Sequence, residues 1–248
     1  MNIRVVVAAM ALAVASIAVT AIVSASAVSN DIVQAVADPS RPKDDRDADA
    51  LRAPAETLAF SGVKPGMTVF ELYPCGGYFS RLLIDVVGPR GKIYGTDNIG
   101  WNGCSEATQK AIAGHANYAL ESEPFGAFRL PQKVDLFWIT QNYHDLHIRK
   151  YGFVDLARFN QAVFDSLKKG GVYFILDHAA NPGTTEADIA NLHRIEKAQV
   201  IKEVEAAGFK LAGEGDFLHR TSDDHTKSIF DASIRGHTDQ YALKFIKP

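Results

Sequence analysis

The chain has 248 residues, 47% of them hydrophobic and 22% charged, which is an ordinary globular composition and enough for one domain with a substantial core. Its formal net charge is -3, and no run of lysine and arginine gives it the electrostatic footprint of a nucleic-acid-binding protein. We therefore expect one large domain and disfavour a nucleic-acid partner. No residue predicts the oligomeric state.

The first residues form an apolar segment typical of a secretory signal. Arg4 precedes an uncharged run, and the small residues Ala-Ser-Ala that end at Ala27 predict cleavage after Ala27. The alternative is a retained membrane anchor, because the apolar run from Val5 to Val23 approaches the roughly 20 residues that span a bilayer. We favour cleavage, which predicts an exported, periplasmic protein with no membrane span after the signal is removed.

Residues 28–46 mix proline with charged residues (DPSRPKDDRD) and are expected to form a flexible lead-in to a single domain over residues 47–248. From Ala48 to Phe60 the apolar residues have helical spacing, which Pro54 interrupts. Because proline is disfavoured inside a helix but suits its first turn, this stretch predicts two short helical pieces.

The strongest signal of a binding site is the stretch Thr68 to Ser80, TVFELYPCGGYFS. It reads as a buried strand containing Glu71, a sharp turn at Gly76 and Gly77, and the start of a helix. Backbone N–H groups at such a turn can face a ligand closely, and a nearby carboxylate can accept hydrogen bonds from ribose hydroxyls. The stretch that ends at Asp97, GKIYGTD, predicts a second strand with such a carboxylate at its end.

The two cysteines of the chain follow these two strands. Cys75 lies in the glycine turn and Cys104 lies just beyond the second strand, so neighbouring strand ends of the expected sheet bring them into the same region. An exported protein permits a disulfide there. Because a bridge requires Cα atoms within about 7 Å, which the sequence does not show, a disulfide and two buried thiols are both open alternatives.

A second site signal follows the apolar stretch Val134 to Thr140, VDLFWIT, which reads as a parallel strand buried on both faces. The polar segment QNYHDLH comes directly after it, at the sheet edge where open α/β proteins bind ligands. His144 is the candidate general base, because imidazole titrates near neutral pH. Asp145 is expected to orient it or to bind substrate. The alternative is a histidine that only satisfies loop carbonyls.

The rest of the chain continues the alternation of helices and strands. A charged stretch over 185–207, which includes His193 and Arg194, is expected to be one amphipathic helix with a charged outer face. The alternative is that His193 and Arg194 reach the cleft. The long polar connection 218–238 is a candidate lid. The other predicted elements are a helix from about Ser105, a helix over Val154–Leu167, and strands over Val172–Leu176, Phe209–Gly213 and Gln240–Ile246. This alternation predicts a doubly wound, Rossmann-like α/β sheet.

The glycine turn, the NYHD segment and LDHAA resemble the class I S-adenosylmethionine-dependent methyltransferases, and more narrowly a group of predicted exported methyltransferases. The resemblance implies a seven-stranded, mostly parallel sheet with an antiparallel last strand, and methyl transfer from S-adenosylmethionine to a small molecule. Tyr73 and Cys75 depart from the family, which has glycine at both positions. The resemblance implies that Glu71, Tyr73, Gly76, Gly77, Asp97, Asn98 and Asn142 bind the cofactor and that His144, Asp145 and Asp177 serve the acceptor.

Two other interpretations keep the same fold. In the first, a divalent metal assists an O-methyltransferase, because Asp177 and His178, with Asp145 or His144 opposite, occupy places similar to the metal ligands of catechol-type enzymes. The leading interpretation assigns no metal ligand. In the second, the protein is an exported ligand-binding protein without catalytic activity, as Tyr73 and the signal segment favour.

Overall fold

The computed structural model describes residues 28–100 and 102–248, so the predicted signal segment lies outside the described residues. Seven strands form one sheet in the order β3-β2-β1-β4-β5-β7-β6. Strand β7 runs antiparallel to both of its neighbours, and the other neighbouring strands are parallel. This arrangement confirms the predicted α/β fold with an antiparallel last strand.

Most strands lie close to the predicted positions, but β5 begins at Leu167, five residues before the predicted start, and one strand is an addition that the sequence did not show. Strand β3 follows a short turn after α5 and pairs with β2 at the edge of the sheet, where most of its residues are partly or fully exposed. An edge strand with polar residues lacks the apolar signal of a buried one. The strands are β1 (Thr68–Leu72), β2 (Lys92–Asn98), β3 (Tyr118–Glu123), β4 (Val134–Thr140), β5 (Leu167–His178), β6 (Lys210–Gly215) and β7 (Gln240–Ile246).

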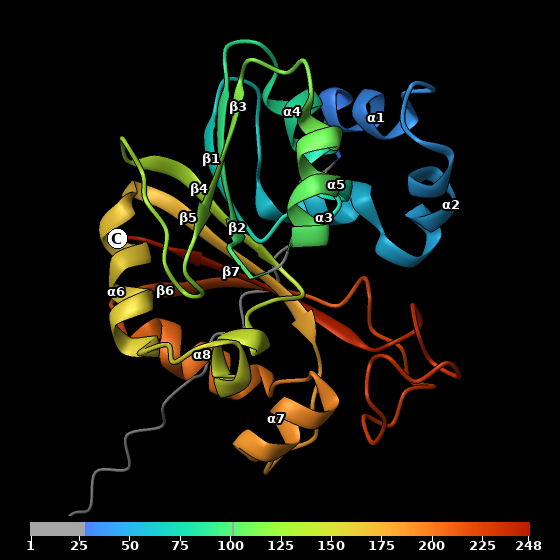
Figure 1. Cartoon of the computed structure of the whole chain (residues 1–248), viewed down its shortest axis with the longest axis vertical. Coiled ribbons are helices and arrows are strands. Elements are labelled where there is room, and N and C mark those ends of the chain that lie inside the picture. The colour runs from blue at the N-terminus through green and yellow to red at the C-terminus, as the bar shows by residue number, and fades with distance from the viewer. Residues whose placement is uncertain (1–27, 101) are drawn as a thin grey trace, which may run out of the picture.

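Helices cover both faces of the sheet and give it three layers (Figure 1). One apolar core lies between the sheet and α1, α3 and α4, and the other lies between the sheet and α6, α7 and α8. The helices are α1 (Asn30–Ala37), α2 (Lys43–Arg52), α3 (Pro54–Ser61), α4 (Tyr78–Val87), α5 (Asn102–Ile112), α6 (Leu156–Ser166), α7 (Glu186–Leu192) and α8 (Lys197–Ala206), with short 3₁₀ turns η1 (His144–His147) and η2 (Arg149–Tyr151). Among the described residues, no helix is both long enough and apolar enough to cross a bilayer.

The expectation of a flexible lead-in over residues 28–46 is wrong. This stretch contains α1 and the start of α2, and α1 buries Ile32 and Ala35 against the rest of the protein. The guanidinium of Arg41 then donates two hydrogen bonds to the Asp49 carboxylate, at 2.7 and 2.8 Å. Apolar residues one turn apart and a buried ion pair therefore order a segment whose composition is mostly polar.

The expectation of one helix over residues 185–207 is also wrong. Helix α7 ends at Leu192, the next residue, His193, has a left-handed φ of 56°, and α8 begins at Lys197. Between them Ile195 forms a parallel bridge with Ala179, just beyond β5. The break turns His193 and Arg194, which we had expected on the charged outer face of a helix, into the interior.

Candidate functional site

The glycine turn between β1 and α4 has an unusual backbone. Tyr73 adopts a φ of 52°, in the left-handed region where the related pattern has glycine, and Gly76 and Gly77 also have positive φ. A Cβ atom on Gly77 would lie 2.4 Å from the Cβ of Ala111 in α5. Gly77 is therefore needed both for its backbone conformation and for the close approach of α5 to the turn.

A disulfide links the glycine turn to α5. Of the two alternatives that the sequence left open, the structure has the Cys75–Cys104 bridge. The hydroxyl of Thr108, one turn further along α5, accepts a hydrogen bond from the backbone N–H of Gly76 at 3.2 Å. The disulfide and this hydrogen bond hold α5 against the turn.

Asp97 lies near the end of β2, beside the disulfide, and is fully buried. Neither oxygen of its carboxylate has a hydrogen-bond partner within the described ranges. Burial raises the pKa of Asp97, and the nearby Ser105, Thr108 and backbone N–H of Cys75 offset only part of that effect. These donors lie near the Asp97 carboxylate, but none of the described residues makes a contact of hydrogen-bond geometry with it. Because a buried carboxylate with incomplete hydrogen bonding is costly, this site is suited to a ligand that brings hydroxyl groups.

The next residue, Asn98, ends the strand and accepts a hydrogen bond from the backbone N–H of Gly100 at 3.2 Å. It therefore shapes the loop that leads away from Asp97.

Glu71 is a buried residue of β1. One carboxylate oxygen accepts hydrogen bonds from the hydroxyls of Ser80 in α4 and Tyr118 in β3, both at 2.7 Å. Burial raises the pKa of Glu71 to about 7, although these two hydrogen bonds act in the opposite direction. The contacts of Glu71 thus connect the glycine turn to the helix and strand around it.

Tyr73 lies between the two ends of the candidate site. Its hydroxyl accepts a hydrogen bond from the backbone N–H of Gly126 at 2.7 Å, and its ring stacks on Phe125 with centroids 5.5 Å apart. Burial raises the pKa of Tyr73, and Asp145 and Asp97 add to this effect. The phenol of Tyr73 is therefore a neutral group between two carboxylates.

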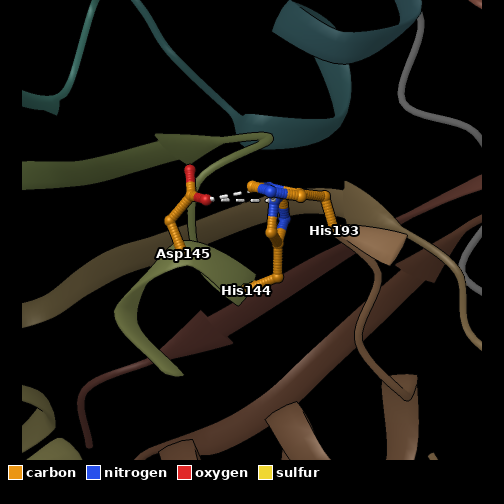
Figure 2. A group of neighbouring side chains, drawn as sticks. All are labelled: His144, Asp145 and His193. Carbon is orange, nitrogen blue, oxygen red and sulfur yellow. Dashed lines mark hydrogen bonds and ion pairs between the residues drawn. The ribbon is translucent and has the colours of Figure 1, made fainter. Parts of the chain in front are cut away.

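At the other end, three side chains meet at the carboxyl ends of β4 and β5 (Figure 2). His144 and Asp145 come from η1, directly after β4, and His193 comes from the break between α7 and α8. His144 Nε2 lies 3.3 Å from His193 Nδ1 and 3.3 Å from Asp145 Oδ1, and His193 Nδ1 lies 3.2 Å from that same oxygen. All three residues are buried.

Asp177 contacts this cluster through His144. One oxygen accepts a hydrogen bond from the backbone N–H of His144 at 2.8 Å, and the other lies 2.7 Å from His144 Nδ1 and accepts from the N–H of His178 at 2.7 Å. The side chain of Asn142 donates to Asp145 Oδ2 at 2.9 Å. The predicted catalytic residues His144, Asp145 and Asp177 therefore lie together, with Asn142 among them.

His178 takes a different place from the one expected in the metal-assisted interpretation. Its Nδ1 lies 2.9 Å from the hydroxyl of Thr238, and burial lowers the pKa of His178 to about 3. The carboxylate of Asp177 is likewise hydrogen-bonded to His144 and His178. Asp177 and His178, which the sequence offered as metal ligands, therefore contact other residues of the protein. The residue that faces Asp145 is His193.

The charge state of His144 follows from its neighbours. Burial alone would lower its pKa, but Asp177 and Asp145 outweigh burial and raise the pKa of His144 to about 10. Burial likewise opposes ionisation of Asp145, yet the neighbouring His144 and His193 outweigh burial and lower the pKa of Asp145. Without a bound cation, His144 is thus protonated at neutral pH, and its role as a general base stays a prediction that requires this proton to leave first.

His193 is the site residue that the sequence analysis did not select, and a signal for it was present. In one continuous helix, His193 and Glu196 would share the buried face with Ile189 and Val200. Two ionisable residues on the apolar face of a helix are unfavourable, and this conflict indicates a break.

The buried Arg194 makes the contacts that stabilise the break between α7 and α8. Its guanidinium donates to the Asp223 carboxylate at 2.8 and 3.1 Å and to the carbonyl oxygens of Ala179 and Lys227. These contacts connect the break to β5 and to the long connection 218–238.

Comparison with family models gives no match for this sequence. No functionally curated protein matches it either. Among solved structures, an S-adenosylmethionine-dependent methyltransferase from Aquifex aeolicus superposes with a TM-score of 0.57 and 17% identity, covering 84% of this chain and 100% of its own. The fold is that of the class I methyltransferases.

Two further neighbours combine the same fold with other roles. Fibrillarin from Aeropyrum pernix, solved with natively bound S-adenosyl-L-methionine, has a TM-score of 0.52 and 16% identity, and the match covers 80% of this chain and 76% of that chain. The [4+2]-cyclase SpnF has a TM-score of 0.55 and 14% identity, covering 82% and 80%. A shared fold at this identity does not determine the reaction.

Proposed function

We propose that this protein is an exported enzyme that transfers a methyl group from S-adenosylmethionine to a small molecule. The observation that carries the proposal is the Asp97 carboxylate, which is buried near the end of β2 with both oxygens lacking a hydrogen-bond partner in the described part of the chain. Two ribose hydroxyls would supply the missing donors. The fibrillarin neighbour, which has this fold, binds S-adenosyl-L-methionine.

We assign binding of the cofactor and binding of the acceptor to different parts of the carboxyl edge of the sheet. S-adenosylmethionine supplies a methyl group on a positively charged sulfur. Asp97 would accept hydrogen bonds from its ribose, and the turn at Gly76 and Gly77 would let the backbone approach it closely. Because an in-line displacement needs donor and acceptor in a fixed alignment, holding both ligands at one edge is the main contribution of the protein.

The acceptor would bind at the end of β4 and β5. Asp145 Oδ1 is buried and has no hydrogen-bond partner among the residues described, so it is the group that an incoming hydroxyl or amine would meet. The carboxylate of Asp177 holds the ring of His144 in place. These groups would orient the acceptor and take part in removing its proton.

Export is supported by the Cys75–Cys104 disulfide, because stable disulfides occur mainly in oxidising compartments. We expect the mature protein to begin at residue 28 and both cysteines to resist alkylation before reduction. N-terminal sequencing and thiol labelling of the exported protein test this. An intact Met1 with two free thiols would contradict it.

The test of the cofactor site is calorimetric titration of the exported protein with S-adenosylmethionine and S-adenosylhomocysteine. We expect binding by the wild type and a loss of at least about 100-fold in Asp97→Ala, because two charge-assisted hydrogen bonds are removed. Asp216→Ala, at an exposed carboxylate on the loop after β6, is the matched control and should bind normally. A folded wild type that binds neither compound would refute the proposal.

A second candidate is a ligand-binding protein that has lost the chemistry. Tyr73 favours it, because a buried tyrosine in a left-handed conformation stands where the related pattern has glycine. Binding of S-adenosylhomocysteine that equals binding of S-adenosylmethionine, with no methylated product from any acceptor pool, would support this candidate.

A further inference from the structure

The arrangement of His144, Asp145 and His193 is more specific than a hydrogen-bonded cluster (Figure 2). Their three facing atoms, His144 Nε2, His193 Nδ1 and Asp145 Oδ1, form a nearly equilateral triangle with sides of 3.2, 3.3 and 3.3 Å. A point about 2.1 Å from all three atoms, the usual bond length to a transition metal, lies about 1 Å outside their plane. All three atoms can therefore bind one ion from the same side.

Hydrogen bonding does not account for all three atoms. The two imidazole nitrogens pair with each other, and both lie within ion-pair distance of Asp145 Oδ1, but this oxygen makes no contact of hydrogen-bond geometry in the part of the chain that the structure describes. The other oxygen of Asp145 accepts from Asn142. The aspartate is thus fixed with this buried oxygen beside two imidazole nitrogens, an arrangement that a positive charge at the triangle would stabilise.

His144 is oriented as a ligand. Its Nδ1 lies 2.7 Å from Asp177 Oδ1, so a hydrogen on Nδ1 leaves the lone pair of Nε2 directed at the triangle. A carboxylate behind a coordinating histidine is the usual way in which proteins fix the ring and its tautomer. The additional hydrogen bond from the backbone N–H of His144 to Asp177 Oδ2 holds this carboxylate in place.

His193 is held at its position by the backbone. Its φ of 56° is a conformation that a residue other than glycine seldom adopts, and its N–H donates to the carbonyl of Ile189 at 2.9 Å. The neighbouring Arg194 is completely buried and bonded to Asp223. Such a conformation persists only where the surroundings enforce it, and it is typical of functional sites.

We propose that His144, Asp145 and His193 bind one divalent transition-metal ion. Two imidazoles and one carboxylate suit zinc, iron(II) or cobalt(II) better than magnesium or calcium, which prefer oxygen ligands. Three protein ligands on one side leave coordination positions open for water or a substrate. If the proposed methyl transfer also holds, an acceptor hydroxyl on this ion would have a lowered pKa, and this last step rests on the proposed function.

The test is metal binding by the full chain, recovered without an affinity tag, treated with a chelator and titrated with Co(II) and with Zn(II). We expect one ion per chain and, for Co(II), visible absorption bands from nitrogen and oxygen ligands. Both cysteines of the chain are in the disulfide, so no thiolate competes. S-adenosylmethionine is absent from this experiment, so its outcome is independent of the proposed function.

Two variants and one control locate the site. His193→Ala and the isosteric Asp145→Asn should each weaken Co(II) binding by more than about 100-fold, because losing a ligand costs more than the 10–100-fold that a lost supporting group costs. His237→Ala, at an exposed histidine of the connection 218–238, should bind like the wild type. Circular dichroism confirms folding, and if His193→Ala does not fold, Asp145→Asn decides the test.

A folded wild type that takes up neither ion stoichiometrically would overturn the proposal. So would binding that is unchanged in the folded variants at positions 145 and 193.

Discussion

The two ends of the sheet edge satisfy their buried polar groups in different ways. At the end of β2, Asp97 has two buried oxygens without a hydrogen-bond partner among the residues that the structure covers. At the ends of β4 and β5, Asp177 binds two residues through three hydrogen bonds, and only one oxygen of Asp145 lacks a partner. The first end thus needs a ligand with several donors, whereas the second is organised before any ligand arrives.

At each end, contacts within the protein hold the surroundings of these carboxylates in place. The surroundings of Asp97 are held by the Cys75–Cys104 disulfide and by the hydrogen bond from Gly76 to Thr108. The acceptor end is held by Asp177 and by the buried Arg194. Removing these supports one at a time should therefore separate the stability of each end from its ability to bind a ligand.

The largest effect is expected from the disulfide. A double replacement, Cys75→Ser with Cys104→Ser, should lower the free energy of unfolding by about 3.5 kcal/mol, because a bridge between residues 29 apart no longer restricts the unfolded chain. Urea denaturation of oxidised, reduced and variant proteins measures this. The reduced wild type is the matched control, and its free energy of unfolding should be close to that of the double variant. Equal free energies for the oxidised, reduced and variant proteins would contradict the account.

The next effect concerns the acceptor end. Asp177→Asn should cost about 3 kcal/mol of stability, because the amide nitrogen would face backbone N–H groups or His144 Nδ1, and a buried charge pair would be broken. Thermal and urea unfolding measure this loss. Asp216→Asn, at an exposed position, should stay within about 0.5 kcal/mol of the wild type. A variant at position 177 as stable as the wild type would show that this end is not preorganised.

A pH-dependent effect is expected from Glu71, which lies beneath the glycine turn. The folded protein raises its pKa from 4.5 to about 7, so between these values the unfolded chain has lost a proton that the folded protein keeps. The free energy of unfolding therefore falls as pH rises through this window, by roughly 2 kcal/mol. Glu71→Gln should remove this part of the slope, with little difference from the wild type near pH 4. Parallel slopes for both proteins between pH 4.5 and 7 would argue against a buried, proton-binding Glu71.

The smallest effect has the opposite sign. Asp97→Asn should raise the free energy of unfolding of the ligand-free protein by about 1 kcal/mol, because it removes a buried charge whose oxygens make no contact of hydrogen-bond geometry with the described residues. Thermal unfolding with and without S-adenosylhomocysteine measures the effect, and the ligand should stabilise the wild type more than the variant. A destabilised variant without ligand would mean that the protein already satisfies Asp97.

The sequence predicted those parts of the molecule that local chemistry determines. The apolar run of β4, the glycine turn after β1 and the helix break at Pro54 each have a short-range physical cause, and all three lie where expected. His144, Asp145 and Asp177 could be grouped because parallel strands end at one edge. The predicted signal cleavage and the role of each site residue stay predictions.

The position of His193 and the disulfide could not be predicted, because both depend on contacts between distant parts of the chain. His193 reaches the site because Ile195 pairs beyond β5 with Ala179, and because Arg194 binds Asp223 in the connection 218–238. Helical periodicity over residues 185–207 gives no account of these contacts. In the same way, the Cys75–Cys104 bridge depends on how closely α5 approaches the glycine turn, which the spacing of the cysteines does not state.

The most direct measurement is a crystal structure of the protein with S-adenosylhomocysteine bound. The account predicts both ribose hydroxyls within hydrogen-bond distance of the Asp97 carboxylate, and the sulfur on the side of the site that holds His144 and Asp145. A nucleoside bound elsewhere, with Asp97 still buried and without hydroxyl partners, would contradict the assignment of the β2 end as the cofactor site.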